Sequence, residues 1–373
     1  MTLRLTTFDG DPRIATWRAA VGAPVALGAP VAAHGGAHGS AHGSAHGAAP
    51  GTPHGTAHGS AYATPHGTPH GSALGPPAPP QPAPELLVVS WNLWIGRGRV
   101  ADALERARAA CFPSGAAPQP PVVLLVQEAY RNGDAVPANP ERMVGASDFS
   151  RRAFPEHDIA AVARDLGMHL VYAPSMRNGT HQSDRGSAIL STLPLERPVA
   201  WELPFSFQRR VAVAASVRVA GREIHLASAH LDPRGGSARD FLGVLGRGLQ
   251  AAGLARGLLE YAGEHRAPLL LGADLNLARG RRERAWRVLA EAGFGHGVPE
   301  RAPTWRHTYH RAPRLLLDWL LVRDPHGELA SVEVHRIDEN AADRGPYVFE
   351  SDHHPLAARV RLAPAPPAPG EAP

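Results

Sequence analysis

The sequence lacks lysine altogether, has one cysteine, and contains no uninterrupted apolar run of 18 residues. The single cysteine, Cys111, excludes an intramolecular disulfide and any zinc site built from cysteine thiolates. The absence of a long apolar run excludes a transmembrane helix. Because there is no lysine, the 38 basic side chains that face 34 acidic ones are all arginines, and the net charge is only +4. This balance is weak support for a nucleic-acid partner.

Residues 19–33, AAVGAPVALGAPVAA, follow Arg18 and end in small residues, as the apolar part of an export signal would. Two prolines and little leucine make the match poor. We therefore favour a cytoplasmic location and leave export open, because a protein with one cysteine fits either compartment. The chain is expected to act as a monomer.

Residues 1–84 are predicted to be a disordered tail, so a chain that begins near Glu85 is expected to fold and to keep its activity. From His34 to Gly71 a four-residue unit, AHGS, recurs in varied forms and brings eight histidines. Such a composition cannot bury enough apolar surface to offset the entropy of ordering its backbone. The imidazoles could bind Zn²⁺, Ni²⁺ or Cu²⁺, but expansion of a low-complexity repeat without a binding role is the favoured interpretation. Residues 363–373 are predicted to be a second disordered end.

Residues 85–362 have a different character and predict one catalytic-sized domain of mixed α/β or α+β class. Short apolar runs that suit buried strands occur at 86–91, 122–127 and 268–273. Amphipathic periodicity predicts helices over 99–111, 156–167 and 281–293. Two further apolar segments, 211–219 and 222–230, are separated by Ala220 and Gly221 and predict a hairpin.

Polar side chains that can bind a metal or transfer a proton occur at the ends of five of the apolar strands and in one further loop. They are Asn92, Glu128, His230, Asp232, Asp274, Asn276, Asp318, Asp352 and His353. One acidic strand end is unremarkable, but a repeated choice of Asn, Asp, Glu and His predicts one site assembled from neighbouring strand ends.

This set of residue types suits metal-assisted hydrolysis of a phosphate ester. Mg²⁺ prefers oxygen ligands and usually takes only one or two carboxylates from a protein, which leaves the other acids for proton transfer. Attack on a phosphoryl centre also needs an oriented water and neutralisation of the phosphate charge. A histidine paired with a carboxylate can supply a held and oriented proton carrier.

Six motifs carry a resemblance to a known family. They are WNLW at 91–94, QE at 127–128, AHLD at 229–232, GADLN at 272–276, LLDWLLV at 316–322 and SDHHP at 351–355. In order and approximate spacing they resemble the endonuclease/exonuclease/phosphatase superfamily, which includes deoxyribonucleases, abasic-site endonucleases, inositol polyphosphate phosphatases and neutral sphingomyelinases. The resemblance covers residues 85–362. It implies a four-layer sandwich, in which two packed mixed β-sheets are flanked by helices on both outer sides.

The resemblance also implies a metal site. Glu128 matches the principal Mg²⁺ ligand of the family, and Mn²⁺ could replace Mg²⁺. Asn92 matches a neighbouring position that contributes to metal or phosphate binding, and Asp352 a second acidic position near the metal. Considered alone, Asn92 could equally cap the turn that follows its strand.

The catalytic positions follow from the same resemblance. Asp274 and Asn276 match a D-x-N motif in which the aspartate positions or activates water and the asparagine orients the phosphate. His353 matches the catalytic histidine and Asp318 the carboxylate that orients it. His230 matches a histidine that contacts the scissile phosphate. A buried Asp318 needs a partner in any case, because an unpaired buried carboxylate is costly.

Other polar residues in these segments have weaker assignments. Arg185, Arg209 and Arg210 are candidates for contacts with substrate phosphate, although surface arginines are usually only solvated. Asp232 precedes a proline and is expected to start a turn. His354 is expected to be structural, because the family pattern places catalysis on the residue directly after Asp352.

Three functions remain in competition. The first is a metal-dependent phosphodiesterase, with nucleic acid as a possible substrate. The second is a phosphomonoesterase or lipid phosphodiesterase acting on inositol phosphates or sphingomyelin. The third is a non-catalytic metal-binding or scaffold protein, which the intact set of polar residues disfavours.

Overall fold

The computed structural model describes residues 3–29, 83–113, 119–138, 155–179, 181–295, 307–340 and 345–364. The histidine repeat and residues 365–373 lie outside the described residues, so the predictions of disorder and of metal binding there stay predictions. No helix in the described part of the chain is long and apolar enough to cross a membrane.

The elements follow one another in this order: β1 (Arg4–Thr6), α1 (Arg13–Ala19), β2 (Val25–Leu27), β3 (Glu85–Asn92), α2 (Val100–Cys111), β4 (Val122–Asn132), α3 (Ile159–Asp165), β5 (His169–Arg177), β6 (Ser183–Ser191), β7 (Glu196–Glu202), β8 (Val211–Val219), β9 (Arg222–His230), η1 (Ala238–Asp240), α4 (Val244–Ala262), β10 (Leu269–Asp274), η2 (Gly280–Arg282), α5 (Arg284–Glu291), β11 (Asp318–Arg323), β12 (Leu329–Arg336) and β13 (Leu356–Leu362). The two short elements η1 and η2 are 3₁₀ turns.

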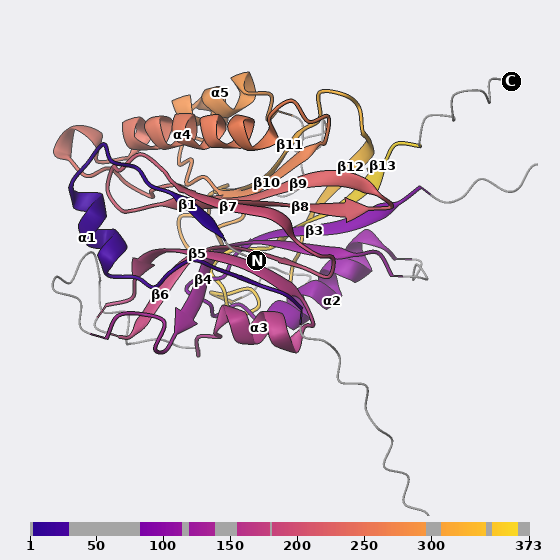
Figure 1. Cartoon of the computed structure of the whole chain (residues 1–373), viewed down its shortest axis with the longest axis horizontal. Helices are drawn as coiled ribbons and strands as arrows, with labels where there is room; N and C mark the ends of the chain where they lie inside the picture. The colour runs from indigo at the N-terminus through magenta and orange to yellow at the C-terminus, as the bar shows by residue number, and fades with distance from the viewer. Residues whose placement is uncertain are drawn as a thin grey trace, which may run out of the picture. The chain divides into compact units, whose positions relative to one another are not determined.

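The strands form two sheets that pack face to face (Figure 1). One sheet has the order β1-β7-β8-β9-β10-β11, and the other has the order β12-β13-β3-β4-β6-β5-β2. Both sheets are mixed, because β3 pairs with β4 and β9 with β10 in parallel, whereas most other neighbours are antiparallel. Helices α4 and α5 cover one outer face, and α2 and α3 cover the other. The predicted four-layer sandwich is therefore confirmed.

Three apolar cores hold these layers together. The central core lies between the sheets and includes Val88, Leu125, Val213 and Leu270, all fully buried. A second core packs the outer face of β3 and β4 against α2 and α3, and a third packs α4 and α5 against β9 to β11. Because strands in the middle of such a sandwich are buried on both faces, they read as continuous apolar runs.

The predicted strands and helices are present, with shifted helix starts. The helix predicted over 156–167 begins at Ile159, because the Asp158 carboxylate accepts hydrogen bonds from two backbone N–H groups of the first turn and caps the helix. The helix predicted over 281–293 becomes a 3₁₀ turn followed by α5. In the β8–β9 hairpin, Ala220 and Gly221 both have positive φ, as a tight two-residue turn requires.

The predicted disordered tail is wrong for residues 3–29. Strand β1 adds to β7 at the edge of one sheet, and β2 adds to β5 at the edge of the other. Between them, α1 buries Ile14 and Trp17, and in Figure 1 this indigo segment lies along both sheets. The pattern escaped sequence analysis because each strand has only three residues. Strand β2, which runs from Val25 to Leu27, therefore lies within the export-like segment and is part of the domain.

Candidate active site

Three of the predicted site residues lie in one row across neighbouring strands. The register pairs Asp274, the last residue of β10, with His230 on β9 and with Asp318 on β11. Side chains at paired positions lie on the same face of a sheet, about 4.5–5.5 Å apart at Cβ. The register alone therefore brings together three residues that are far apart in the chain. Asp274 is 44 positions from His230 and 44 positions from Asp318, since 274 − 230 and 318 − 274 both equal 44.

Asn92 and Glu128 reach the same place from the other sheet. Asn92 ends β3 and pairs in register with Gln127 on β4. The register between β4 and β6 is interrupted between Val126 and Ala129, and Glu128 has φ of 51°. Such a bulge turns a side chain away from its regular direction, and positive φ is costly for a residue with a Cβ atom. The backbone is strained at the position where a carboxylate is predicted to bind metal.

His353 and Asp318 form a close pair. His353 Nδ1 lies 2.7 Å from Asp318 Oδ2, and both side chains are buried. The backbone N–H of Asp318 donates to the Thr308 hydroxyl, and the indole N–H of Trp91 donates to the His353 carbonyl. Because a carboxylate can only accept, Nδ1 of His353 carries the proton, and its Nε2 faces the other acidic groups.

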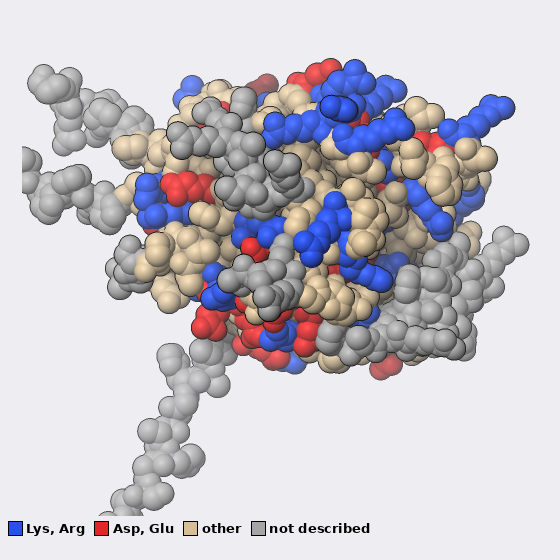
Figure 2. Space-filling view, turned by 180° about the vertical axis from the view of Figure 1, so that it is seen from behind, with Lys and Arg blue, Asp and Glu red and all other residues tan. Residues whose placement is uncertain are grey.

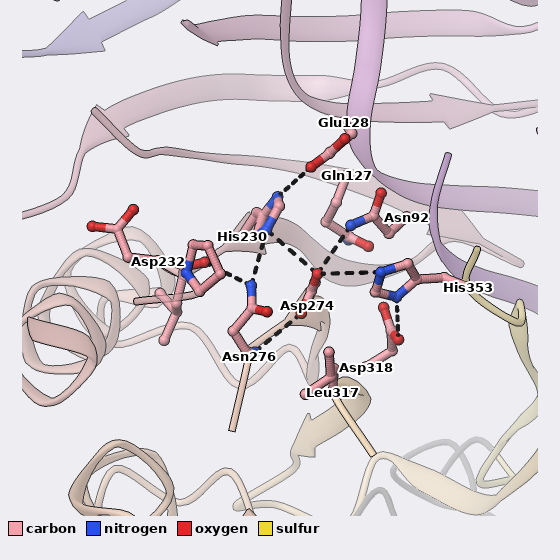
Figure 3. Close-up of polar contacts among 12 residues, drawn as sticks. Asn92, Gln127, Glu128, His230, Asp232, Asp274, Asn276, Leu317, Asp318 and His353 are labelled. Carbon is pink, nitrogen blue, oxygen red and sulfur yellow. Dashed lines mark hydrogen bonds and ion pairs between the residues drawn. The ribbon is translucent and has the colours of Figure 1, made fainter. Parts of the chain in front are cut away.

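Asp274 lies at the centre of the cluster (Figure 3). Its carboxylate accepts hydrogen bonds from Asn92 Nδ2 at 2.9 Å and from the Asn276 backbone N–H at 3.0 Å. His230 Nε2 lies 3.4 Å away and His353 Nε2 4.0 Å away. Asp274 therefore contacts groups from both sheets.

Asn276 and His230 are held beside each other. Asn276 Nδ2 lies 3.1 Å from His230 Nε2 and donates to the Leu231 carbonyl. On its other side, His230 Nδ1 is 4.0 Å from Glu128 Oε1. Asn276 has φ of 51°, so it is a second non-glycine site residue with positive φ.

Burial and crowded charge shift the proton affinities of these groups. Burial raises the pKa of Asp274, and the Asp318 carboxylate raises it further. Burial raises the pKa of Asp352 to about 6, with His353 opposing the shift and Glu128 adding to it. Burial lowers the pKa of His353, but the charge and hydrogen bond of Asp318 outweigh burial, so the pKa is raised.

The second histidine of the site behaves in the opposite way. Burial lowers the pKa of His230 well below its usual value, and the positive charges of Arg210 and His353 act in the same direction. The site thus contains one imidazole that favours the charged form and one that favours the neutral form. Pairs of titratable groups whose environments separate their pKa values are typical of catalytic sites.

The cluster lines a cavity of about 430 Å³. Predicted residues that line it are Asn92, Glu128, Arg185, Arg210, His230, Asp274, Asn276, Asp352 and His353. Asp318 lies behind His353 and does not line the cavity, as expected of a carboxylate that orients another group.

The structure places Arg209, one of the predicted phosphate contacts, away from the cavity. This guanidinium is buried, its Nε donates to Glu202, and it is not among the groups that line the cavity. Arg185 and Arg210 do line the cavity. Arg210 is also bound to Asp232 at 2.8 Å, which limits how far it can move.

Asp232 has a larger structural role than the predicted turn. Its carboxylate accepts hydrogen bonds from Arg210, from the Gln250 side chain and from the backbone N–H groups of Phe207 and Gln208. It therefore fixes the segment that carries Arg210 at the cavity rim. A fully buried acid with four donors is a means of positioning its neighbours.

Three further residues of the site were missed by sequence analysis. Gln127 Nε2 donates to Ser228 Oγ and to the Gly272 carbonyl, so it joins the two sheets beneath the cavity. Tyr309 lines the cavity, with its ring 5.1 Å from the His353 ring, and the Thr308 hydroxyl accepts two backbone N–H groups. Tyr309 and Thr308 lie in a loop without periodicity, so no sequence signal marks them.

The oxygen donors at the cavity fit a hard divalent cation. Glu128, Asp352 and the Asn92 side chain all line it, and Asp274, Asp318 and His353 also offer ligand atoms within 4.8 Å of one another. After burial, the charge of Asp318 raises the pKa of Asp274 and that of Glu128 raises the pKa of Asp352, so carboxylates lie close together here. A divalent cation would reduce the repulsion between these carboxylates, and Mg²⁺ and Mn²⁺ prefer such oxygen donors.

A four-layer sandwich with paired acids and imidazoles at the ends of its central strands is an enzyme architecture of the phosphoesterase type. The chain belongs to the Endonuclease/Exonuclease/phosphatase family, whose model matches residues 89–353. Members of this family are generally hydrolases that act on phosphoric esters. The family resemblance that the six motifs carry is therefore confirmed.

Solved structures that are similar to the chain include the following three. The human Nocturnin catalytic domain is 16% identical, with 75% of this chain and 96% of that chain covered and a TM-score of 0.47. Truncated TDP2 from Caenorhabditis elegans is 17% identical, with 74% and 97% covered and a TM-score of 0.45. Sphingomyelinase C from Streptomyces griseocarneus is 17% identical, with 74% and 99% covered and a TM-score of 0.43. No curated protein sequence matches the chain.

Proposed function

We propose that the chain is a phosphodiesterase that depends on a divalent cation, Mg²⁺ or Mn²⁺, and hydrolyses its substrate by attack of water. The observation that carries this proposal is the buried His353–Asp318 pair, whose free imidazole nitrogen faces Asp274 at 4.0 Å on the cavity wall. A held imidazole, a second carboxylate and a cavity at the strand ends of both sheets are the parts that water attack on a phosphate requires.

Each residue has a distinct role in this proposal. Asp318 holds the proton on Nδ1 of His353, so that Nε2 exchanges a proton with the reacting oxygen. Asp274 orients the attacking water and accepts its proton. Asn276 and the neutral His230 lie next to each other and would bind the non-bridging oxygens of the phosphate.

Glu128 and Asp352, with the Asn92 side-chain oxygen, would hold the cation. When bound, a divalent cation polarises the phosphoryl group and neutralises developing negative charge. The strained backbone at Glu128 supports this assignment, because strained residues concentrate where a side chain must be aimed.

Glu128→Gln is expected to raise the Mg²⁺ concentration needed for half-maximal activity by about 10-fold or more, because it removes one charged oxygen from the ligand set without changing its shape. Hydrolysis of bis-p-nitrophenyl phosphate at a series of Mg²⁺ and Mn²⁺ concentrations, after treatment with EDTA, measures the effect. The exposed Glu264 provides a matched control, because Glu264→Gln changes the same charge away from the cavity. Activity that persists in EDTA would contradict the metal requirement.

An arginine-rich turn beside the cavity favours a polyanionic substrate such as nucleic acid. Ala278 lines the cavity, and the exposed arginines that follow it are Arg279, Arg281, Arg282, Arg284 and Arg287. Figure 2 shows arginine side chains gathered over the upper part of one face of the molecule. Clustered cationic side chains bind successive phosphates and raise the rate of encounter with a polyanion.

A second candidate, a lipid phosphodiesterase, is favoured by an apolar patch. Phe241, Leu242, Leu245 and Leu249 are 70%, 48%, 59% and 55% exposed. The buried Arg247 donates to the carbonyls of Asp232 and Pro233, so the start of α4 is fixed to the cavity rim. An exposed apolar cluster beside a site often marks an interaction surface.

Two variants separate these substrate classes. The triple variant Arg279→Gln, Arg282→Gln and Arg287→Gln is expected to raise KM for single-stranded or duplex DNA and to make it less dependent on salt. The variant Leu245→Gln with Leu249→Gln is expected to leave DNA hydrolysis unchanged. Two results together favour the lipid function. The leucine variant lowers hydrolysis of sphingomyelin in vesicles, and the arginine variant does not affect DNA cleavage.

A further inference from the structure

A second cluster of histidines lies apart from the cavity. His307, His310 and His354 each place a ring nitrogen so that the three atoms lie within 4.8 Å of one another. The His310–His354, His307–His354 and His307–His310 ring centroids are 4.9, 5.4 and 6.3 Å apart. None of the three residues lines the cavity. The family motifs leave two of them without a role, and His354 was expected only to be structural.

Two backbone hydrogen bonds fix this arrangement. The N–H of His310 donates to the Asp352 carbonyl, and the N–H of His354 donates to the Thr308 carbonyl, both at 2.8 Å. The loop before β11 and the loop before β13 are therefore joined as a short antiparallel pair. His310 and His354 are buried, whereas His307 is partly exposed.

Close contacts with acceptor oxygens set the tautomers of His310 and His354. His310 Nε2 lies 2.7 Å from the Gly345 carbonyl, which can only accept, so this nitrogen carries the proton. His354 Nδ1 lies 2.9 Å from Asp338 Oδ1 and 3.4 Å from the Ile337 carbonyl, so it is also protonated. In the neutral rings, His310 Nδ1 and His354 Nε2 then present lone pairs to each other.

These two nitrogens are only 2.9 Å apart. Two lone pairs at this distance repel each other unless a proton or a metal ion lies between them. Tetrahedral coordination at about 2.0–2.1 Å places ligand nitrogens about 3.3 Å apart, so a small outward movement would admit a metal. The third imidazole, His307, lies on the side that is open to solvent.

The surroundings resemble the outer shell of a histidine–metal site. A carboxylate beside the far ring nitrogen of a ligating histidine fixes its tautomer and raises its basicity. Asp338 holds this position next to His354. Arg336 Nη1 lies 3.2 Å from His307 Nε2, but its guanidinium also pairs with Asp338, at 3.0 Å from Nη2 to Oδ2, so the pair brings no net charge.

We propose that His307, His310 and His354 form a binding site for a transition-metal ion of the Zn²⁺ class, separate from the oxygen-rich catalytic site. Three neutral imidazoles suit Zn²⁺, Ni²⁺ or Cu²⁺ and are a poor set for Mg²⁺. The ion joins the loop that ends in Asp352 and His353 to the loop that carries Thr308. Its role is therefore to hold both members of the His353–Asp318 pair in place.

Zinc binding by the full-length chain tests the proposal without reference to activity. The eight histidines of the repeat are first replaced by serine, because they would compete for metal; they are His34, His38, His42, His46, His54, His58, His66 and His70. Zn²⁺ is then titrated in competition with a chromophoric chelator, and Co²⁺ is titrated as a spectroscopic probe. We expect one equivalent of Zn²⁺ to bind tightly and Co²⁺ to give the absorption of a low-coordinate nitrogen site.

Variants show which residues bind this one equivalent of Zn²⁺. His310→Asn is expected to abolish it, and Asp338→Asn to weaken it by about 10- to 100-fold through the outer shell. His326→Asn, at an exposed histidine, is expected to change nothing. Circular dichroism and the melting temperature without zinc show whether each variant is folded, and the rise in melting temperature on adding zinc reports binding.

Two outcomes overturn the proposal. One is the absence of tight Zn²⁺ binding in the folded protein in which serine replaces the eight repeat histidines. This result would mean that a shared proton separates His310 and His354. The other is Zn²⁺ binding that is lost in Glu128→Gln and kept in His310→Asn, because the metal would then be in the catalytic site.

Discussion

His353→Ala is expected to lower kcat for bis-p-nitrophenyl phosphate by about 10²- to 10⁴-fold, the usual effect of losing a general acid–base group. The variant removes the only imidazole within hydrogen-bond reach of Asp318 in the described structure, while Asp274 and the cation ligands remain. Steady-state kinetics at saturating Mg²⁺ separate this loss in kcat from any change in KM. A loss confined to KM would contradict the assigned role.

Asp318→Asn and the double variant sharpen the same test. If Asp318 acts only through His353, then adding Asp318→Asn to His353→Ala should cause little further loss, because the effects of residues that act as a unit are not additive. His353→Gln is the folding control, because its amide can still donate to the buried Asp318 carboxylate. Additive losses would mean that the two residues work independently.

The fold was largely predictable because its central strands are buried on both faces. Continuous apolar runs such as 86–91 and 268–273 have few alternatives to a buried strand, and they became β3 and β10. The N-terminal segment was not predictable on the same ground. β1 and β2 each add only three residues to an existing sheet edge. Their positions therefore depend on β7 and β5, the strands with which they pair.

The site was predictable to the level of residue types at strand ends, with individual roles taken from the family resemblance. Asp274, His230 and Asp318 meet because of strand register, which the apolar pattern implies but does not state. The fate of Arg209 could not be foreseen, because it depends on Glu202, a residue at the end of another strand. The histidine cluster escaped for a related reason, since its members meet only through loop pairing.

Residues 3–29 are expected to contribute substantially to stability. The Arg18 guanidinium donates to both oxygens of the buried Glu202, and the Phe8 N–H donates to the same carboxylate. Gly22 N–H donates to the buried Asp184. Removing residues 1–29 is therefore expected to lower the free energy of unfolding by about 3–5 kcal/mol, because these hydrogen bonds are lost together with the burial of Ile14 and Trp17. Urea denaturation of the full chain and of the shortened chain measures the difference.

Point variants separate the ion pair from the strand pairing. Arg18→Met is expected to cost only about 1–3 kcal/mol, because Arg209 still binds Glu202. Asp9→Asn is the matched control, because Asp9 is exposed and lies 3.8 Å from the same guanidinium. Its effect should be within about 0.5 kcal/mol. A shortened chain as stable as the full one would mean that this segment packs without stabilising the domain.

The Arg18→Met effect should also depend on pH in a defined direction. Burial raises the pKa of Glu202, but the hydrogen bond from Arg18 and the charge of Arg209 outweigh it and hold the pKa below its ordinary value. A carboxylate whose pKa is lowered by folding stabilises the protein above its ordinary pKa and loses that contribution as the pH falls through the lowered value. The difference in stability between wild type and Arg18→Met should therefore be full at neutral pH and should shrink in acid. A difference that stays constant in acid would assign the effect to the packing of the Arg18 side chain, because protonation of Glu202 cannot alter apolar contacts.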